Sequence, residues 1–130
     1  MTFTLPIYWT KGVRKPTTHL VGINFYRNAH FHVKNQLKSE LESTLLKQFA
    51  NVGPILGPYQ VHYNVYYKNP SCDGSNIAAL MEKIFLDAGQ FAGILREDNV
   101  QHHLSSTWSI AGQDKLNPRC EIHITQPESV

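Results

Sequence analysis

Cysteines, long hydrophobic runs and acidic residues near the N-terminus are all scarce in this sequence. The two cysteines, Cys72 and Cys120, form no closely spaced pair, which argues against a disulfide framework and against a four-cysteine zinc site. The sequence contains no run of 18 apolar residues, and its first residues lack the pattern of a signal peptide. We therefore expect a cytoplasmic protein with no membrane partner.

The length and composition predict a single folded domain over residues 1–130. Hydrophobic residues make up 42% of the chain, which is enough for a core, and charged residues only 17%, which is too few for a disordered tail. We find no internal repeat and no low-complexity linker that would divide the chain.

Charge is distributed unevenly along the chain. Residues 1–38 contain six lysines and arginines and no acidic residue, whereas residues 39–130 contain the other six basic residues and all ten acidic ones. The two segments therefore carry +6 and −4. Basic segments attract polyanions such as nucleic acid, although an acidic protein partner is an alternative. The residues predicted to contact nucleic acid are Lys11, Arg14, Lys15 and Arg27.

Two segments have the hydrophobic spacing of helices. Apolar residues recur every four positions over 33–49, and two Gly-Pro pairs then stop the helix. A second helix is predicted over about 76–88, capped by Ser75 and ended by Gly89, with one apolar side that packs on a sheet.

Alternating hydrophobic and polar residues predict strands over 59–68, 99–110 and 119–125, the last two forming a hairpin. Residues 2–9 contain Pro6 and suit an edge strand, while 10–32 are expected to be mostly loop with a short strand at 21–26. The predicted fold is a single α/β domain whose mixed sheet of about four to five strands is flanked by two helices.

Three carboxylates adjoin the central predicted strands. Asp73 follows strand 59–68, and Glu97 and Asp98 precede strand 99–110. They would converge only if these two strands were antiparallel. Converging carboxylates suit Mg²⁺, which keeps bound water and binds substrate phosphates; solvated loop caps are the alternative interpretation.

The second predicted helix carries a polar edge. Asn76, Lys83 and Asp87 lie within about 40° of one another on a helical projection. They form either a row that reaches towards Asp73 or an ordinary exposed Lys83–Asp87 pair four residues apart.

These residues resemble a known family. Asp73-Gly-Ser-Asn76, followed by Lys83, Leu86-Asp87-Ala88 and Glu97-Asp98-Asn99, is similar to the signature of the RusA family of Holliday junction resolvases from phages and prophages. The resemblance covers nearly the whole chain. It implies that Asp73 and Asp98 are metal carboxylates, that Asn76 is the amide of the signature, and that Lys83 lies near the scissile phosphate.

The sequence departs from that signature at two positions. Ser75 replaces the usual second aspartate, and Lys83 follows Asn76 by seven residues instead of three. Loss of an acidic ligand weakens metal binding, and Asn76, Ser75 or Glu97 would have to compensate for it. The extra four residues are about one helical turn, so Lys83 stays on the same side of the helix.

The resemblance implies a magnesium-dependent endonuclease, with Mn²⁺ as a substitute, that resolves four-way or branched DNA. A homodimer is expected because a four-way junction has two-fold symmetry. If the protein comes from a phage, it would act in the cytoplasm of the bacterial host. A non-catalytic DNA-binding protein of the same fold is the main alternative, favoured by Ser75; a protein-interaction domain is the second.

Overall fold

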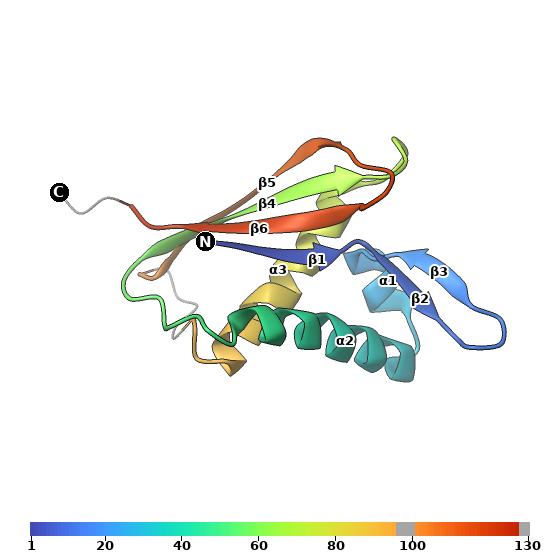
Figure 1. Cartoon of the computed structure of the whole chain (residues 1–130), viewed down its shortest axis with the longest axis horizontal. Helices are drawn as coiled ribbons and strands as arrows, with labels where there is room; N and C mark the ends of the chain where they lie inside the picture. Colours follow the sequence, from blue (N-terminus) through green and yellow to red (C-terminus); the bar gives the residue numbers. More distant parts are fainter. Residues whose placement is uncertain (96–100, 128–130) are drawn as a thin grey trace.

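The computed structural model describes residues 1–95 and 101–127 (Figure 1). In chain order the elements are β1 (Thr2–Pro6), β2 (Tyr8–Lys11), β3 (Thr17–Leu20), α1 (Ile23–Asn28), α2 (Phe31–Phe49), β4 (Tyr59–Tyr67), α3 (Gly74–Phe91), β5 (His103–Gln113) and β6 (Arg119–Thr125). A four-stranded mixed sheet has the order β1-β6-β4-β5, and β2 and β3 form a separate two-stranded sheet. The predicted α/β class with a mixed sheet is confirmed.

The central strand β4 determines the topology of the sheet. It pairs in parallel with β5, to which α3 connects it, and antiparallel with β6, which in turn pairs antiparallel with β1. Its alternate residues Tyr59, Val61, Tyr63 and Val65 are all buried, as the sequence pattern predicts.

The predicted hairpin between the last two strands is wrong. β5 and β6 lie on opposite sides of β4, and residues 114–118 cross the end of β4, where the Asp114 N–H donates to the carbonyl of Tyr67 at 2.8 Å. Burial explains the arrangement: Cys120, Ile122 and Ile124 of β6 are buried, as suits an inner strand, whereas most of β5 is exposed or half-buried at the edge.

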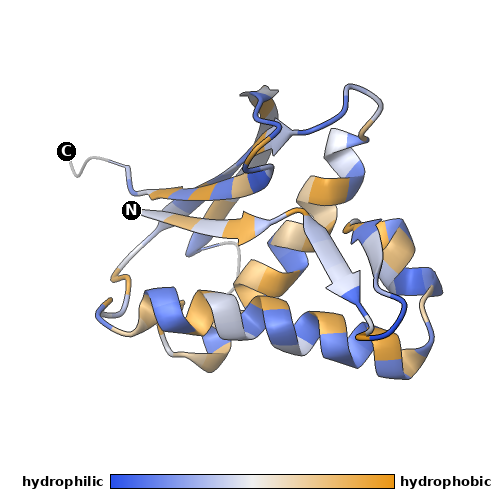
Figure 2. Ribbon diagram, turned by 45° about the vertical axis from the view of Figure 1, so that its right-hand side comes forward, coloured by the Kyte–Doolittle hydropathy of each residue, from blue (hydrophilic) through white to orange (hydrophobic). Residues whose placement is uncertain are grey.

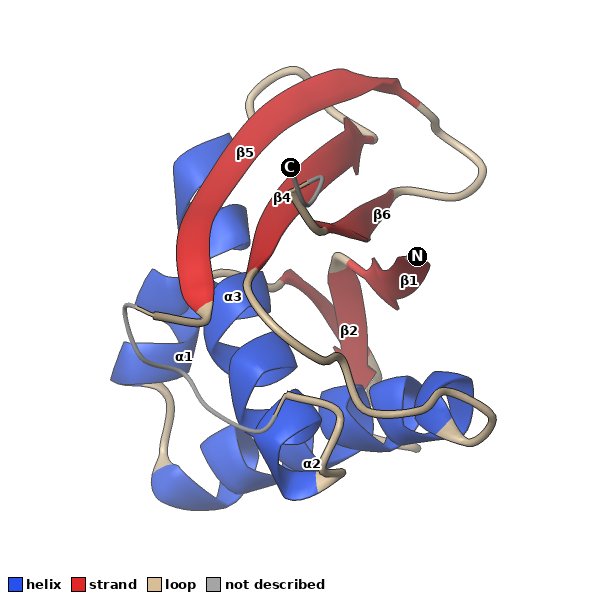
Figure 3. Ribbon diagram, turned by 90° about the vertical axis from the view of Figure 1, so that its left-hand side faces the viewer, coloured by secondary structure: helices blue, strands red, loops and turns tan. Residues whose placement is uncertain are grey.

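Both long helices lie on one face of the four-stranded sheet (Figures 1 and 3). The predicted apolar side of α3 is buried, and α3 is more uniformly hydrophobic than α2 in Figure 2. Phe85 of α3 lies at the centre of an aromatic cluster, with ring centroids 5.8 Å from Phe3, 6.0 Å from Phe49 and 6.4 Å from Tyr63. The core therefore joins both helices to the inner face of the sheet.

The N-terminal segment is more ordered than predicted. Residues 2–9 contain β1 at the edge of the main sheet and the start of β2, and residues 8–20 form the β2–β3 hairpin. Where a strand was predicted at 21–26, the chain instead enters α1 through Gly22, whose carbonyl accepts from the N–H of Tyr26 at 3.0 Å. Short apolar runs fit either element, and here the close packing of Gly22 on α3 favours the helix.

Helix α3 extends beyond both predicted ends. Asp73, not Ser75, is its N-cap. Gly89 lies within the helix instead of ending it. A Cβ at this position would come within 2.7 Å of the Leu95 side chain. The glycine therefore allows a close contact.

Two expectations from composition can be compared with the described residues. Cys72 is half-buried and Cys120 buried, and both are free thiols. None of the helices described in Figure 1 is both long and apolar enough to cross a membrane.

Gly22 provides a test of how α1 packs on α3. A Cβ at Gly22 would come within 2.1 Å of the Asn76 side chain, which would then have to give up its hydrogen bond to α1. We expect Gly22→Ala to lower the free energy of unfolding by about 1–3 kcal/mol in urea denaturation. Gly53→Ala is the control, because nothing lies within 4 Å of that position. Equal stability of the two variants would contradict this packing.

Candidate functional site

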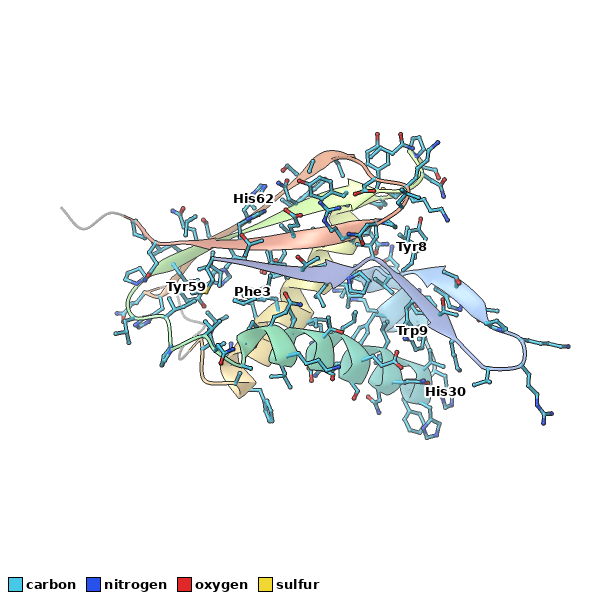
Figure 4. The ribbon with its side chains drawn as sticks, viewed as in Figure 1. Phe3, Tyr8, Trp9, His30, Tyr59 and His62 are labelled. Carbon is cyan, nitrogen blue, oxygen red and sulfur yellow. The ribbon has the colours of Figure 1, made fainter. Side chains whose placement is uncertain are left out.

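The β2–β3 hairpin projects from the body of the molecule (Figures 1 and 4). Its connection, residues 12–16, begins at Gly12, whose φ of +96° favours glycine, and exposes the side chains of Arg14 and Lys15. Val13 beside them is 98% exposed. Lys11 lies at the end of β2 and faces Thr17 across the hairpin. Three of the four residues predicted to bind nucleic acid therefore lie on one projection.

The base of the hairpin is fixed to the helices by aromatic contacts. The Trp9 indole N–H donates to the Glu40 carboxylate of α2, and the Trp9 ring lies 6.5 Å from that of Phe25 in α1. His19 on the opposite strand stacks on Phe25 at 4.7 Å. These contacts fix the base of the hairpin next to α1, and the basic tip projects from it (Figure 1).

Further basic and aromatic residues surround α1. Arg27, the fourth predicted residue, is exposed in the last turn of α1, and the Lys34 ammonium lies 5.1 Å above the Tyr26 ring. Phe31 is 58% exposed at the start of α2, with its ring 4.7 Å from that of His30 and 3.9 Å from that of His32. Figure 4 places His30 at the same end of the molecule as Trp9.

We call this region the basic end, and it comprises Lys11, Arg14, Lys15, Arg27 and Lys34. Lys38 differs from these residues because its ammonium lies 3.7 Å from Glu42 and 3.6 Å from Asp87. The basic residues that cluster in the first part of the sequence therefore also lie together at one end of the folded chain.

Asp73 acts as the cap of α3. Its Oδ1 accepts hydrogen bonds from the Ser75 hydroxyl at 2.8 Å and from the backbone N–H of Asn76 at 3.2 Å. The Ser75 hydrogen bond, and then that from Asn76, lower the pKa of the carboxyl because they stabilise its charged form. Asp73 therefore carries a full negative charge at neutral pH.

Asn76 holds two helices together. Its side-chain oxygen accepts from the backbone N–H of Asn24 at 2.9 Å, which ties the start of α3 to the start of α1. The same contact brings the Asp73 turn next to the helix that carries Arg27. The amide oxygen that the resemblance offers to a metal already has a partner in the fold.

Lys83 forms an exposed ion pair with Asp87 and is not part of a row that reaches towards Asp73. Its ammonium lies 3.4 Å from Asp87, which it shares with Lys38 of α2. Asp73 and Lys83 are ten residues apart along the helix, a rise of about 15 Å. The two side chains expected to face one phosphate are thus well separated.

Glu97 and Asp98 lie outside the described residues. The condition set for their approach to Asp73, an antiparallel pairing of the flanking strands, is not met, because β5 runs parallel to β4 and His103 pairs with Tyr59 at the start of both strands. Within residues 1–95 and 101–127, no three His, Cys, Asp or Glu side chains are grouped closely enough to hold a metal. Of the predicted metal carboxylates, the structure describes only Asp73, which follows the end of β4, whereas His102, just after the other two, accepts from the Tyr59 N–H at the start of β4.

The structure also contains a cleft that the sequence reasoning missed. It lies between α3 and β5, has a volume of about 170 Å³ and is lined by Tyr63, Ser75, Glu82, Ser106 and Trp108, among others. One signal was available: Ser106 and Trp108 are two positions apart in the predicted strand 99–110, so alternation places them on the same side. Their position opposite α3 depends on the parallel register, which alternation does not encode.

The capping role of Asp73 predicts a pH-dependent stability. The pKa of this carboxyl is lower in the folded chain, so its contribution is present above the unfolded pKa and is lost as the pH falls through the folded value. We expect Asp73→Ala to be destabilised at pH 7 in urea denaturation, and the difference from wild type to shrink in acid.

Asp73→Asn is the matched control, because asparagine caps helices about as well as aspartate but does not titrate. It should keep most of the wild-type stability at pH 7. If Asp73→Ala and wild type differ by the same amount at pH 7 and pH 3, the charge of Asp73 has no part in capping.

No known family model matches the sequence, and no curated protein matches it closely enough to count as a relative.

Proposed function

We propose that the protein binds branched DNA through the basic end and cleaves it in a magnesium-dependent reaction, as the resemblance to RusA-type resolvases implies. The observation that carries the proposal is the gathering of Lys11, Arg14, Lys15, Arg27 and Lys34 at one end of the fold. Phosphate contacts of this kind supply most of the affinity for nucleic acid without reading its sequence.

The shape of the basic end supports a nucleic-acid partner over an acidic protein. Its cations lie on a projecting hairpin, on the short helix α1 and in the first turn of α2, where exposed Phe31 provides a face on which a base can stack. Cationic grooves with aromatic platforms are typical of proteins that bind unpaired strands. The continuous stacking of the duplex is interrupted at a branch point, so the faces of bases are accessible there.

For cleavage, the chain has to hold a carboxylate at a fixed position where it can bind the metal ion. Asp73 is exposed and ionised, and Asn76 ties its turn to α1, beside the basic end. Asp73 would supply one carboxylate to a magnesium ion, and because the parallel β4 and β5 do not meet the condition for Glu97 or Asp98 to join it, phosphate oxygens of the DNA and water would complete the coordination. The bound ion supplies an activated water and stabilises charge that develops on the phosphate.

A second candidate, junction binding without cleavage, has its own supporting observation. Ser75 replaces an expected carboxylate, and its hydroxyl donates to Asp73 instead of adding negative charge. In both candidates we expect a homodimer, which would match the two-fold symmetry of a four-way junction, and a cytoplasmic location.

One experiment tests the proposal and separates the two candidates. The purified chain is mixed with a labelled four-way junction or with a duplex of equal length. Each mixture contains either EDTA or about 10 mM Mg²⁺ or Mn²⁺. We expect tighter binding to the junction in EDTA and symmetric cleavage with the metal. Binding without cleavage supports the second candidate, and equal affinity for the junction and the duplex contradicts both.

Ser75→Asp tests the same point from the opposite direction. An added carboxylate beside Asp73 should raise the affinity for Mg²⁺ and increase cleavage, and a negative charge in the first turn of α3 is favourable for the helix. Cleavage is measured over a Mg²⁺ titration. A fall in cleavage with unchanged junction binding would mean that Ser75 does not occupy a ligand position.

A further inference from the structure

The cleft between α3 and β5 has a polar floor and an aromatic wall. Its floor includes Tyr63, which is 1% exposed, and its wall includes Trp108, which is 46% exposed. Two small residues of α3, Ala78 and Ala79, line the cleft and leave room for it. Gly74 lies so close to the Trp108 ring that a Cβ there would come within 2.7 Å of it. The indole is therefore held by the start of the helix.

The Tyr63 hydroxyl is buried at the floor of the cleft. Among residues 1–95 and 101–127 it has no hydrogen-bond partner of normal geometry, although Ser106 lies beside it. Burial, and secondarily the charge of Glu82, raise the pKa of Tyr63, so the hydroxyl keeps its proton and can donate. A buried polar group without a partner is costly, so a ligand atom that accepts from Tyr63 would be favoured.

Ser106 and Glu82 also line the cleft, so it contains both hydrogen-bond donors and acceptors. The Ser106 hydroxyl is fixed by the His103 Nε2 at 2.7 Å, and Glu82 brings a half-buried carboxylate, which accepts hydrogen bonds but does not donate them. A complementary ligand therefore has acceptors for Tyr63, an amine for Glu82 and a flat face for Trp108.

The size of the cleft limits that ligand to one small ring system. A cavity of about 150 Å³ holds benzene, so a cleft of about 170 Å³ has room for a single heterocycle and none for a base pair. Cytosine, adenine and guanine carry an exocyclic amine, whereas the donor of thymine and uracil is a single ring N3–H between two carbonyl oxygens, which a carboxylate would repel.

We infer that this cleft binds one unstacked nucleobase that carries an exocyclic amine, with Trp108 as the stacking face and Glu82 and Tyr63 as the groups that read its edge. The inference rests on the proposed function, since bound branched DNA would supply the base. It adds a site of base selection to the phosphate contacts of the basic end.

Free nucleosides test the cleft without DNA binding. The full chain, labelled with ¹⁵N, is titrated with cytidine, uridine and ribose while the two tryptophan indole signals are followed. We expect cytidine to shift the Trp108 signal and to bind about tenfold more tightly than uridine, since a hydrogen bond to a charged group is worth about that factor. Trp9, 7% exposed and bonded to Glu40, is the internal reference.

Variants distinguish recognition from general stacking. Glu82→Gln should reduce the preference for cytidine to about twofold or less, because an amide can face either an amine or a carbonyl. Tyr63→Phe should weaken cytidine binding. Glu42→Gln, the same change on α2, is the control and should leave the preference intact.

The outcomes separate this inference from the proposed function. If cytidine and uridine bind equally, if neither binds, or if ribose alone shifts Trp108, the inference is overturned, whatever the junction experiment gives. If cytidine binds selectively but the chain has no affinity for the junction, the cleft is a base site and the proposed function fails.

Discussion

The Arg14→Ala/Lys15→Ala double variant is expected to bind a four-way junction about thirtyfold more weakly than wild type at 0.15 M salt. Each phosphate contact releases counterions and adds about 0.9 to the slope of log affinity against log salt. Two lost contacts therefore make the slope shallower by about 1.8, and between 1 M and 0.15 M salt this difference in slope amounts to about thirtyfold in affinity. Both residues are exposed at the hairpin tip, so their removal should leave stability unchanged. Fluorescence anisotropy at several salt concentrations gives the slope.

The matched control is Lys47→Ala/Lys115→Ala, which removes the same charge from two exposed positions outside the basic end. If attraction to DNA depends only on net charge, the two double variants should lose equal affinity. We expect the control to keep nearly the wild-type slope. A slope that is the same in all three proteins would mean that the DNA surface lies elsewhere.

Local sequence patterns predicted the centre of this fold well. In β4, every second residue from Tyr59 to Val65 is buried, and in α3 the apolar side from Ile77 to Ala88 is buried. In both elements the period of hydrophobic residues matches the geometry of the backbone, so the signal is local. The sequence left open whether the strands on either side of α3 are parallel, and the structure shows that β4 and β5 are.

Pairing between distant strands could not be predicted in this way. Alternation shows that β6 has one buried side, but it does not show that β6 lies between β1 and β4. That choice depends on which strand has the most apolar surface to bury, a property of the whole sheet. The cap of α3 was missed for a related reason, since Asp73 and Ser75 are both good caps, and only the folded chain shows that the helix begins at Gly74 and that Asp73 accepts the Asn76 N–H.

The candidate site was predicted in part. Sequence reasoning named the basic residues, and the structure adds that Trp9 and Phe25 hold the hairpin beside α1. It also named Asn76, whose observed role is to join two helices. Contacts between residues distant in the chain, such as Asn24 with Asn76, depend on tertiary packing and have no periodic signature.

Asp73→Asn is expected to reduce magnesium-dependent junction cleavage by about a hundredfold or more while binding in EDTA persists. Asp73 would hold the cation that stabilises the reacting phosphate, and loss of one such stabilising interaction has an effect of this order. Asparagine keeps the helix cap, so the loss would come from charge and not from unfolding. Cleavage rates are measured with enzyme in excess over the junction, with Mg²⁺ varied.

Asp87→Asn is the control on the same helix, since Asp87 faces Lys38 and Lys83 and lies away from the cap. It should cleave at nearly the wild-type rate. Asp98→Asn and Glu97→Gln then test whether either acid is a ligand in spite of the parallel strands, because only a variant that removes a ligand should raise the Mg²⁺ concentration needed for half-maximal cleavage. If Asp73→Asn cleaves like wild type, Asp73 is a structural cap alone, and any metal ligands must be sought among other residues.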